Sequence, residues 1–260
     1  MNDWDDAERR VEKAQELFEQ RRWSEALEEL RAATDINPYN GGWFFNIGLT
    51  LDEMGRFEEA IDAYRRALNI DDADLQAMNH LGVDLHRVGQ LEQALETFQM
   101  IESVDASFEP AYCNRIITFT DLGDHEKAEE MFYLARLYKE HCPHCYYNIG
   151  CSLADRGLYD KAIYCWQKTL DLDEQYPDVH VRIAEAMWNK GELDSYLIEI
   201  TRDILAVKDE GGGHVIDLDP AVTRQHLPRR TCQHQPGGRP LTASGLSMAG
   251  DLYLPPGFNE

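Results

Sequence analysis

Small and apolar residues recur along this chain at a fixed spacing of 34 residues. A first column is almost entirely alanine, in the series Ala26, Ala60, Ala94, Ala128, Ala162 and Tyr196. A second column is mostly glycine or alanine, in the series Ala14, Gly48, Gly82, Ile116, Gly150 and Ala184. A large, mostly aromatic residue follows four positions after the first column, in the series Leu30, Tyr64, Phe98, Phe132, Trp166 and Ile200. No gap interrupts this register, so the sequence predicts a tandem repeat.

The residue types in these columns predict a helical hairpin in each repeat. Small residues in two columns let two helices approach closely, and the aromatic residue fills the space beside them. A further column, Arg21 followed by Gly55, Gly89, Gly123, Gly157 and Gly191, falls where the first helix must end with a positive φ. One hairpin cannot bury its apolar face alone, so the repeats must stack into a solenoid.

Each unit resembles the tetratricopeptide repeat (TPR), a 34-residue helix–turn–helix. In the unit that begins at Leu75, the slots of this family hold Met78, Leu81, Gly82, Leu85, Gly89, Ala94 and Phe98. The units from Gly41 and Pro143 match in the same way, and the resemblance covers about residues 7–207. It implies an all-α fold, a right-handed α–α superhelix.

We expect a solenoid over residues 1–209 and a flexible tail after it. Five full hairpins are predicted at residues 7–40, 41–74, 75–108, 109–142 and 143–176, and a degenerate capping hairpin at 177–209. The segment 210–260 opens with three glycines and has no periodicity, which predicts a flexible, Gly/Pro-rich C-terminal tail. Its apolar end leaves three alternatives open: self-interaction with a solenoid groove, recognition by another protein, or plain disorder.

The charge of the chain limits the classes of partner. Its 260 residues include 48 Asp or Glu and 25 Lys or Arg, a net charge of −23. Such a charge repels phosphate backbones, which argues against nucleic acid and favours basic partners. No apolar run reaches the roughly 20 residues that cross a bilayer, and the N-terminus lacks the layout of a secretory signal. We therefore expect a cytoplasmic protein without a membrane partner, whose six cysteines are mostly reduced.

The family resemblance implies a peptide-binding groove on the first helices of the repeats. Asparagine suits such a groove because its amide both donates to and accepts from a peptide backbone. The candidate groove residues are Phe45, Asn46, Leu49, Asn79, His80, Asn114, Ile117, Tyr147, Asn148, Arg182 and Trp188. Apolar side chains with acidic neighbours favour a protein or peptide with apolar or basic residues. The alternative is that the asparagines are polar residues tolerated on an exposed helix face.

One short motif offers a different chemistry. Residues 142–145 read Cys-Pro-His-Cys, which resembles the active-site tetrapeptide of thioredoxin-fold disulfide oxidants, and Cys142 would lie at a helix N-terminus that stabilises a thiolate. A metal site could instead use His141, Cys142, His144, Cys145 and, from the neighbouring helix, Cys113. Neither a βαβ pattern nor a second ligand pair accompanies the motif, so we interpret it as a structural turn between repeats.

No phosphate-binding loop, Ser-His-Asp arrangement or zinc-protease motif is present in the sequence. The sequence therefore predicts a non-catalytic scaffold or adaptor without a cofactor or metal. A thiol-redox or metal-binding protein that uses Cys142 and Cys145 is the alternative.

Overall fold

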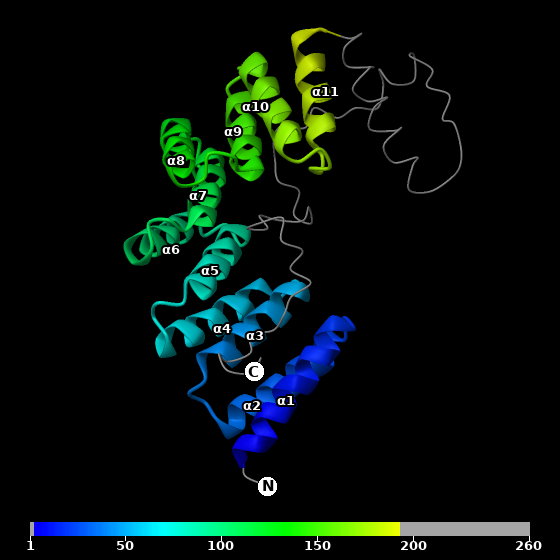
Figure 1. Ribbon diagram of the computed structural model, residues 1–260, viewed down its shortest axis with the longest axis vertical. Coiled ribbons are helices and arrows are strands. Elements are labelled where there is room, and N and C mark those ends of the chain that lie inside the picture. Colours follow the sequence, from blue (N-terminus) through cyan, green and yellow to red (C-terminus); the bar gives the residue numbers. More distant parts are fainter. Residues whose placement is uncertain (1–2, 193–260) are drawn as a thin grey trace, which may run out of the picture. The chain divides into compact units, whose positions relative to one another are not determined.

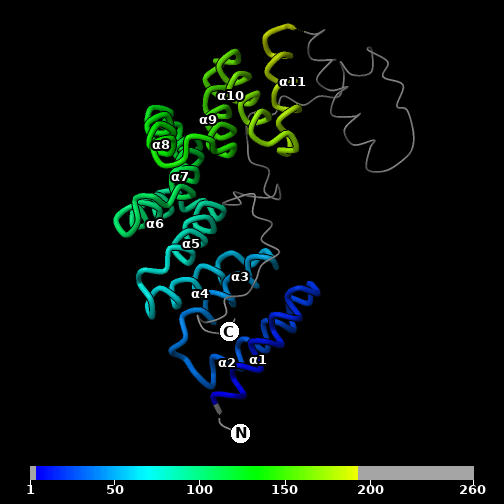
Figure 2. The backbone as a smooth tube through the Cα atoms, viewed as in Figure 1, coloured from blue at the N-terminus to red at the C-terminus, as the bar shows by residue number. Residues whose placement is uncertain are grey.

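The computed structural model describes residues 3–192, which form eleven α-helices joined by short turns (Figures 1 and 2). The helices are α1 (Asp3–Glu19), α2 (Trp23–Ile36), α3 (Gly41–Glu53), α4 (Phe57–Ile70), α5 (Leu75–Arg87), α6 (Leu91–Val104), α7 (Glu109–Asp121), α8 (His125–Tyr138), α9 (Pro143–Asp155), α10 (Tyr159–Leu172) and α11 (Val179–Lys190). The expected all-α fold is confirmed. Within the described residues, no helix is long and apolar enough to cross a membrane.

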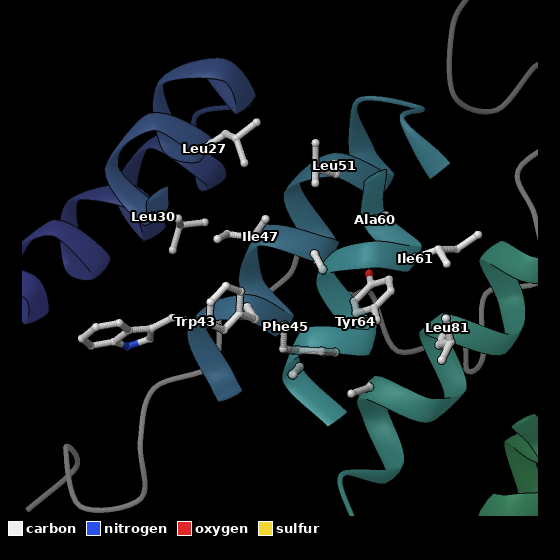
Figure 3. Close-up of a cluster of buried hydrophobic side chains, with 14 of the residues drawn as sticks. Leu27, Leu30, Trp43, Phe45, Ile47, Leu51, Ala60, Ile61, Tyr64 and Leu81 are labelled. Carbon is white, nitrogen blue, oxygen red and sulfur yellow. The ribbon is translucent and has the colours of Figure 1, made fainter. Parts of the chain in front are cut away.

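The described chain divides into two compact units, and the boundary falls inside α7, between Thr118 and Phe119. In the N-terminal unit each helix from α1 to α6 packs against the next in chain order. Figure 3 shows the resulting core, in which Leu30 of α2, Ile47 of α3 and Tyr64 of α4 are buried members of one hydrophobic cluster. Sequential packing of helical hairpins is therefore what buries the apolar columns in this unit.

The C-terminal unit follows the same rule. Helix α8 packs against α9, α9 against α10, and α10 against α11. Trp166 of α10 and Ile183 of α11 are among its fully buried large side chains. The helices thus form stacked, TPR-like pairs, as the 34-residue pattern predicts.

The small and aromatic columns meet directly in three of the hairpins. A Cβ placed on Gly48 would lie 2.3 Å from Tyr64 Cε1, and one on Gly82 would lie 2.4 Å from Phe98 Cε1. In the fifth hairpin, a Cβ on Gly150 would lie 2.5 Å from Trp166 Nε1. The aromatic ring of the second helix therefore occupies the volume that any side chain in the glycine column would need.

The turn column also has the expected backbone conformation. Gly55 adopts a φ of +72°, and the other turn glycines have similar values. In the first repeat the same position is occupied by Arg21, which takes a φ of +58°. Because a side chain disfavours this left-handed region, Arg21 is a strained substitute for glycine.

The first repeat carries charge where the later repeats are apolar. Arg10 Nη1 lies 2.9 Å from Glu29 Oε2, and Lys13 Nζ lies 2.6 Å from Glu29 Oε1. Glu29 on α2 thus pairs with both cations of α1, which suits a terminal hairpin with no preceding repeat to cover it. The second helix of the predicted capping hairpin and the predicted tail at 210–260 lie outside the described residues.

Candidate binding surface on the first helices

Side chains on successive first helices contact each other at a separation of 35 residues. The rings of Phe45 on α3 and His80 on α5 have centroids 5.5 Å apart. Asn114 Nδ2 on α7 donates to Asn79 Oδ1 on α5 at 2.8 Å. In the C-terminal unit, Arg182 Nε on α11 donates to the Tyr147 hydroxyl on α9 at 3.4 Å. Each repeat therefore meets its neighbour one position further along than the 34-residue register alone implies.

The asparagines of the predicted groove are buried. Asn46 is fully buried, and Asn79 and Asn114 are nearly so. Asn148 of α9 is also buried, with 7% of its surface exposed. Their amides lie at the contacts between first helices, and one of these contacts is the Asn79–Asn114 hydrogen bond. Their role in holding a peptide backbone stays a prediction.

The other candidate residues of the N-terminal unit form an aromatic and aliphatic surface. Phe45 and Ile117 are buried, whereas Leu49 and His80 are partly exposed. His80 lies between two rings, with centroids 5.5 Å from Phe45 and 5.7 Å from Tyr64. Burial, with a smaller contribution from the charge of Arg87, lowers the pKa of His80 to about 4. The imidazole is therefore neutral at physiological pH.

A charged cluster that the column pattern did not single out lies beside this surface. Arg87 Nη1 donates to Asp84 Oδ1 at 2.8 Å and also bonds Asp52 Oδ1. Burial raises the pKa of Asp84 to about 8, and the negative charge of Asp52 adds to this effect, against the opposing charge of Arg87. The available signal was an aspartate inside an apolar run: Asp84 stands between Val83 and Leu85, which are both buried.

The candidate residues of the C-terminal unit gather around a pair of tyrosines. The rings of Tyr147 and Tyr176 have centroids 5.0 Å apart, and His144 Nδ1 lies 2.8 Å from the Tyr176 hydroxyl. Burial raises the pKa of both phenols, so they remain neutral. Arg182 also bonds Glu185 at 3.3 Å, and Trp188 is 36% exposed. Tyr176 is a member of this group that the candidate residues chosen from the sequence did not include.

The Cys-Pro-His-Cys motif forms the N-terminus of α9. The backbone N–H of Cys145 donates to Cys142 Sγ at 3.3 Å, so Cys142 is the N-cap residue, and Pro143 opens the helix. Both cysteines are 1% exposed, and their sulfur atoms lie within 4.8 Å of each other. His141 is exposed, while His144 is held by Tyr176. This geometry is that of a capped inter-repeat turn, and the redox and metal functions stay predictions.

Comparison with curated proteins finds only short matches to a dehydrogenase. The chain is 56% identical over 39 residues to 6-phosphogluconate dehydrogenase, decarboxylating, of Pseudescherichia vulneris, which is 14% of this chain and 9% of that protein. The NADP(+)-dependent enzyme of Bacillus subtilis (strain 168) is 44% identical over 64 residues, which is 25% of this chain and 13% of the enzyme. The chain thus spans about a tenth of the length of these relatives. Such short stretches do not show a dehydrogenase activity.

Solved structures match much more of the fold. A tetratricopeptide repeat protein from Parabacteroides merdae ATCC 43184 superposes with a TM-score of 0.68 at 18% identity, over 77% of this chain and 80% of that chain. The type IV pilus biogenesis factor PilW gives a TM-score of 0.66 at 16% identity, over 76% and 93%. YrrB, described as a TPR protein with an unusual peptide-binding site, gives 0.53 at 18% identity, over 65% and 88%. At these identities the likeness concerns the fold alone.

Family models match the sequence itself in three overlapping or separate stretches. The tetratricopeptide repeat model matches residues 11–74 and 45–111, and a TPR repeat model matches residues 150–191. Together these stretches cover more than half of the 260 residues. With the stacked helical hairpins of the structure, they show that the chain belongs to the tetratricopeptide repeat family.

Proposed function

We propose that this protein is a non-catalytic interaction scaffold that binds an extended segment of another polypeptide on the first helices of its repeats. Membership of the TPR family supports binding of proteins or peptides in general, because the fold is typically an interaction scaffold and is usually non-catalytic. The printed description of YrrB shows that a chain with a similar fold carries a peptide-binding site. The proposal adds that the bound segment contains apolar and basic residues.

The observation that carries the proposal is the combination of side chains on α3. Leu49 is partly exposed on the same helix as Asp52, which is partly exposed, and Glu53, which is exposed. One turn of helix separates the apolar side chain from the two carboxylates, so both kinds of surface are available to one short ligand. A segment with alternating apolar and basic residues is complementary to this arrangement.

The asparagines enter the proposal as groups that bind the ligand backbone. Asn46, Asn114 and Asn148 lie on successive or alternate first helices, at corresponding positions of their repeats. Because they are buried between helices, binding would require their amides to exchange a present contact for one with the peptide. Backbone capture would make affinity partly independent of the ligand sequence.

Site-specific cross-linking tests where the partner binds. We would place a photo-reactive benzoylphenylalanine at Leu49 on α3 and, as the matched control, at Met100 on α6, a second helix of the same unit. The expected result is cross-linking of defined peptides, containing apolar and basic residues, from Leu49 but not from Met100. Equal cross-linking from both positions would contradict binding on the first helices. A cross-link to residues 245–260 of a second copy would identify the C-terminal segment as the ligand.

Charge reversal tests the preference for basic segments. Glu53→Lys places a cation beside the proposed surface, and Glu96→Lys makes the same change at an exposed position of α6. We expect Glu53→Lys to weaken binding of the cross-linked segment by about tenfold and Glu96→Lys to change it little. Equal effects would show that only the overall charge of the protein matters.

A further inference from the structure

Residues from three helices of the N-terminal unit form one buried ionic group, which we call the Asp52–Asp84 cluster. It comprises Asp52 of α3, Tyr64 of α4, and Asp84 and Arg87 of α5. Arg87 Nη1 bonds both carboxylates, and the Arg87 guanidinium lies 5.0 Å from the centroid of the Phe57 ring. Asp84 and Tyr64 are fully buried, whereas the side chains of Asp52 and Arg87 are 18% and 14% exposed. The cluster is therefore rigidly held from within and reaches the surface at Asp52 and Arg87.

Three polar atoms of this cluster are buried without a hydrogen-bond partner among the described residues. They are the Tyr64 hydroxyl, Asp84 Oδ2 and Arg87 Nε. Buried polar atoms in folded proteins are normally paired, so two unpaired oxygens in one cluster are an exception that requires an explanation. The negative charges of Asp52 and Asp84 raise the pKa of Tyr64 in addition to burial, which places the phenol within electrostatic reach of both carboxylates. Two unpaired acceptors thus lie in the field of two acidic groups.

The charges of the cluster do not balance. Two carboxylates face one guanidinium, and Glu53 adds a further negative charge at the surface. Burial raises the pKa of both Asp52 and Asp84, that of Asp84 to about 8, so the cluster retains a proton near neutral pH. His80 supplies no positive charge because its own pKa is lowered to about 4. One additional cation would balance two ionised carboxylates and Arg87.

We propose that the Asp52–Asp84 cluster binds the ammonium group of a lysine side chain from the partner segment. Asp84 Oδ2, the Asp52 carboxylate and the Tyr64 hydroxyl oxygen supply acceptors for the three N–H donors of the ammonium group. The lysine enters at Asp52, beside Leu49 and Glu53 on α3. The proposal rests on the peptide-binding function above and assigns one position of the bound segment.

The charge of the cluster favours a monovalent ammonium group over a divalent metal ion. With both carboxylates ionised, Arg87 and one ammonium group bring the total to zero, whereas a divalent ion would leave a net positive charge in a buried place. The slender four-carbon stem of lysine also carries its charge at a single point, which suits a cluster that is open only at one edge.

Peptide binding to the full chain tests this site. The probe is an acetylated and amidated hexapeptide of alternating leucine and lysine, and its control is the same peptide with every lysine acetylated. Calorimetry should show that the wild-type protein binds the charged probe about tenfold more tightly than the control. Asp84→Asn should abolish this preference, while Asp62→Asn, which removes an exposed carboxylate from α4, should preserve it.

The pH dependence provides a second expected result. Lysine binding ionises Asp84, so the affinity of the wild-type protein for the charged probe should rise from pH 6 to 8 and then level off. The affinity of Asp84→Asn should stay flat over this range. A measurement on the wild-type protein alone covers the case in which this variant does not fold: n-butylammonium should lower the pKa of the Asp84 carboxyl, followed by carbon-13 NMR, and sodium at equal ionic strength should not.

Different failures have different meanings. Equal binding of both peptides by the wild-type protein, or equal effects of Asp84→Asn and Asp62→Asn, would overturn the lysine site and leave the scaffold function standing. A pKa of Asp84 that n-butylammonium does not change would overturn it too, and would assign the cluster a purely structural role. Binding of neither peptide would contradict the proposed peptide-binding function, and the lysine site with it.

Discussion

Asn114 and Asn79 form a buried side-chain hydrogen bond of 2.8 Å, although the repeat register aligns Asn114 with His80. The bond joins α7 to α5 and spans 35 residues of sequence. It uses side-chain atoms on two first helices, where apolar packing alone would permit sliding. We infer that the pair fixes the relative register of two neighbouring repeats in the N-terminal unit.

Removing either amide should destabilise this unit. Asn114→Ala leaves the Asn79 carbonyl oxygen buried without its donor, and we expect the free energy of unfolding to fall by about 1–3 kcal/mol. Urea titration followed by circular dichroism measures this loss. Asn69→Ala, at an exposed position of α4, is the control and should change stability little.

A double-mutant cycle tests the pair itself. Asn79→Ala combined with Asn114→Ala should cost less than the sum of the two single changes, because the second change no longer leaves an unpaired amide. Additive losses would show that the hydrogen bond does not couple the two helices.

Most of the fold was predictable because its determinants are periodic. Ala60 and its equivalents are fully buried, and Gly48, Gly82 and Gly150 each face the aromatic residue of the same hairpin. These residues act within one repeat, so a single 34-residue column contains the whole interaction. The same argument explains why the helix-ending position of Gly55 could be located from sequence.

Gly82→Ala tests the contact between the small and aromatic columns. Alanine normally stabilises a helix relative to glycine, but here its Cβ would overlap the ring of Phe98. We expect a net loss of about 1–3 kcal/mol in the free energy of unfolding. In a Phe98→Leu background the same Gly82→Ala change should cost less, since the smaller side chain leaves room. An unchanged cost in that background would show that the loss does not arise at this ring.

Arg21→Gly should stabilise the protein. Arg21 holds a φ of +58° at the position that glycine occupies in the later repeats. Relief of this strain is worth about 1–2 kcal/mol, and the greater freedom of glycine in the unfolded chain offsets about 0.4–1 kcal/mol of it. The expected net gain is about 0.5–1 kcal/mol, measured as an increased urea midpoint. Arg31→Gly, within helix α2, is the opposing control and should lower stability.

The candidate site was less predictable, because its contacts join different positions of neighbouring repeats. Asn79 and Asn114 stand in different columns, as do Phe45 and His80, so no single column displays either pair. Asp84 has no charged equivalent at Thr118 in the next repeat, and its pairing with Arg87 and Asp52 depends on the packing of α3 against α5. A column analysis finds what every repeat shares, whereas this cluster consists of what one pair of repeats does differently.

The protonation of Asp84 should make the stability of the protein depend on pH. In the folded protein this carboxyl keeps its proton until about pH 8, whereas in the unfolded chain it loses the proton near pH 4. The unfolded state therefore binds fewer protons between these values, and the contribution of Asp84 to stability is lost as pH rises through this range. His80 acts in the opposite direction below about pH 6.5, so the comparison belongs between pH 6.5 and 8. There the free energy of unfolding of the wild-type protein should decline relative to Asp84→Asn by about 1 kcal/mol per pH unit. Asp62→Asn should run parallel to the wild-type protein, and a parallel course for Asp84→Asn as well would show that the folded carboxyl is already ionised at pH 6.5.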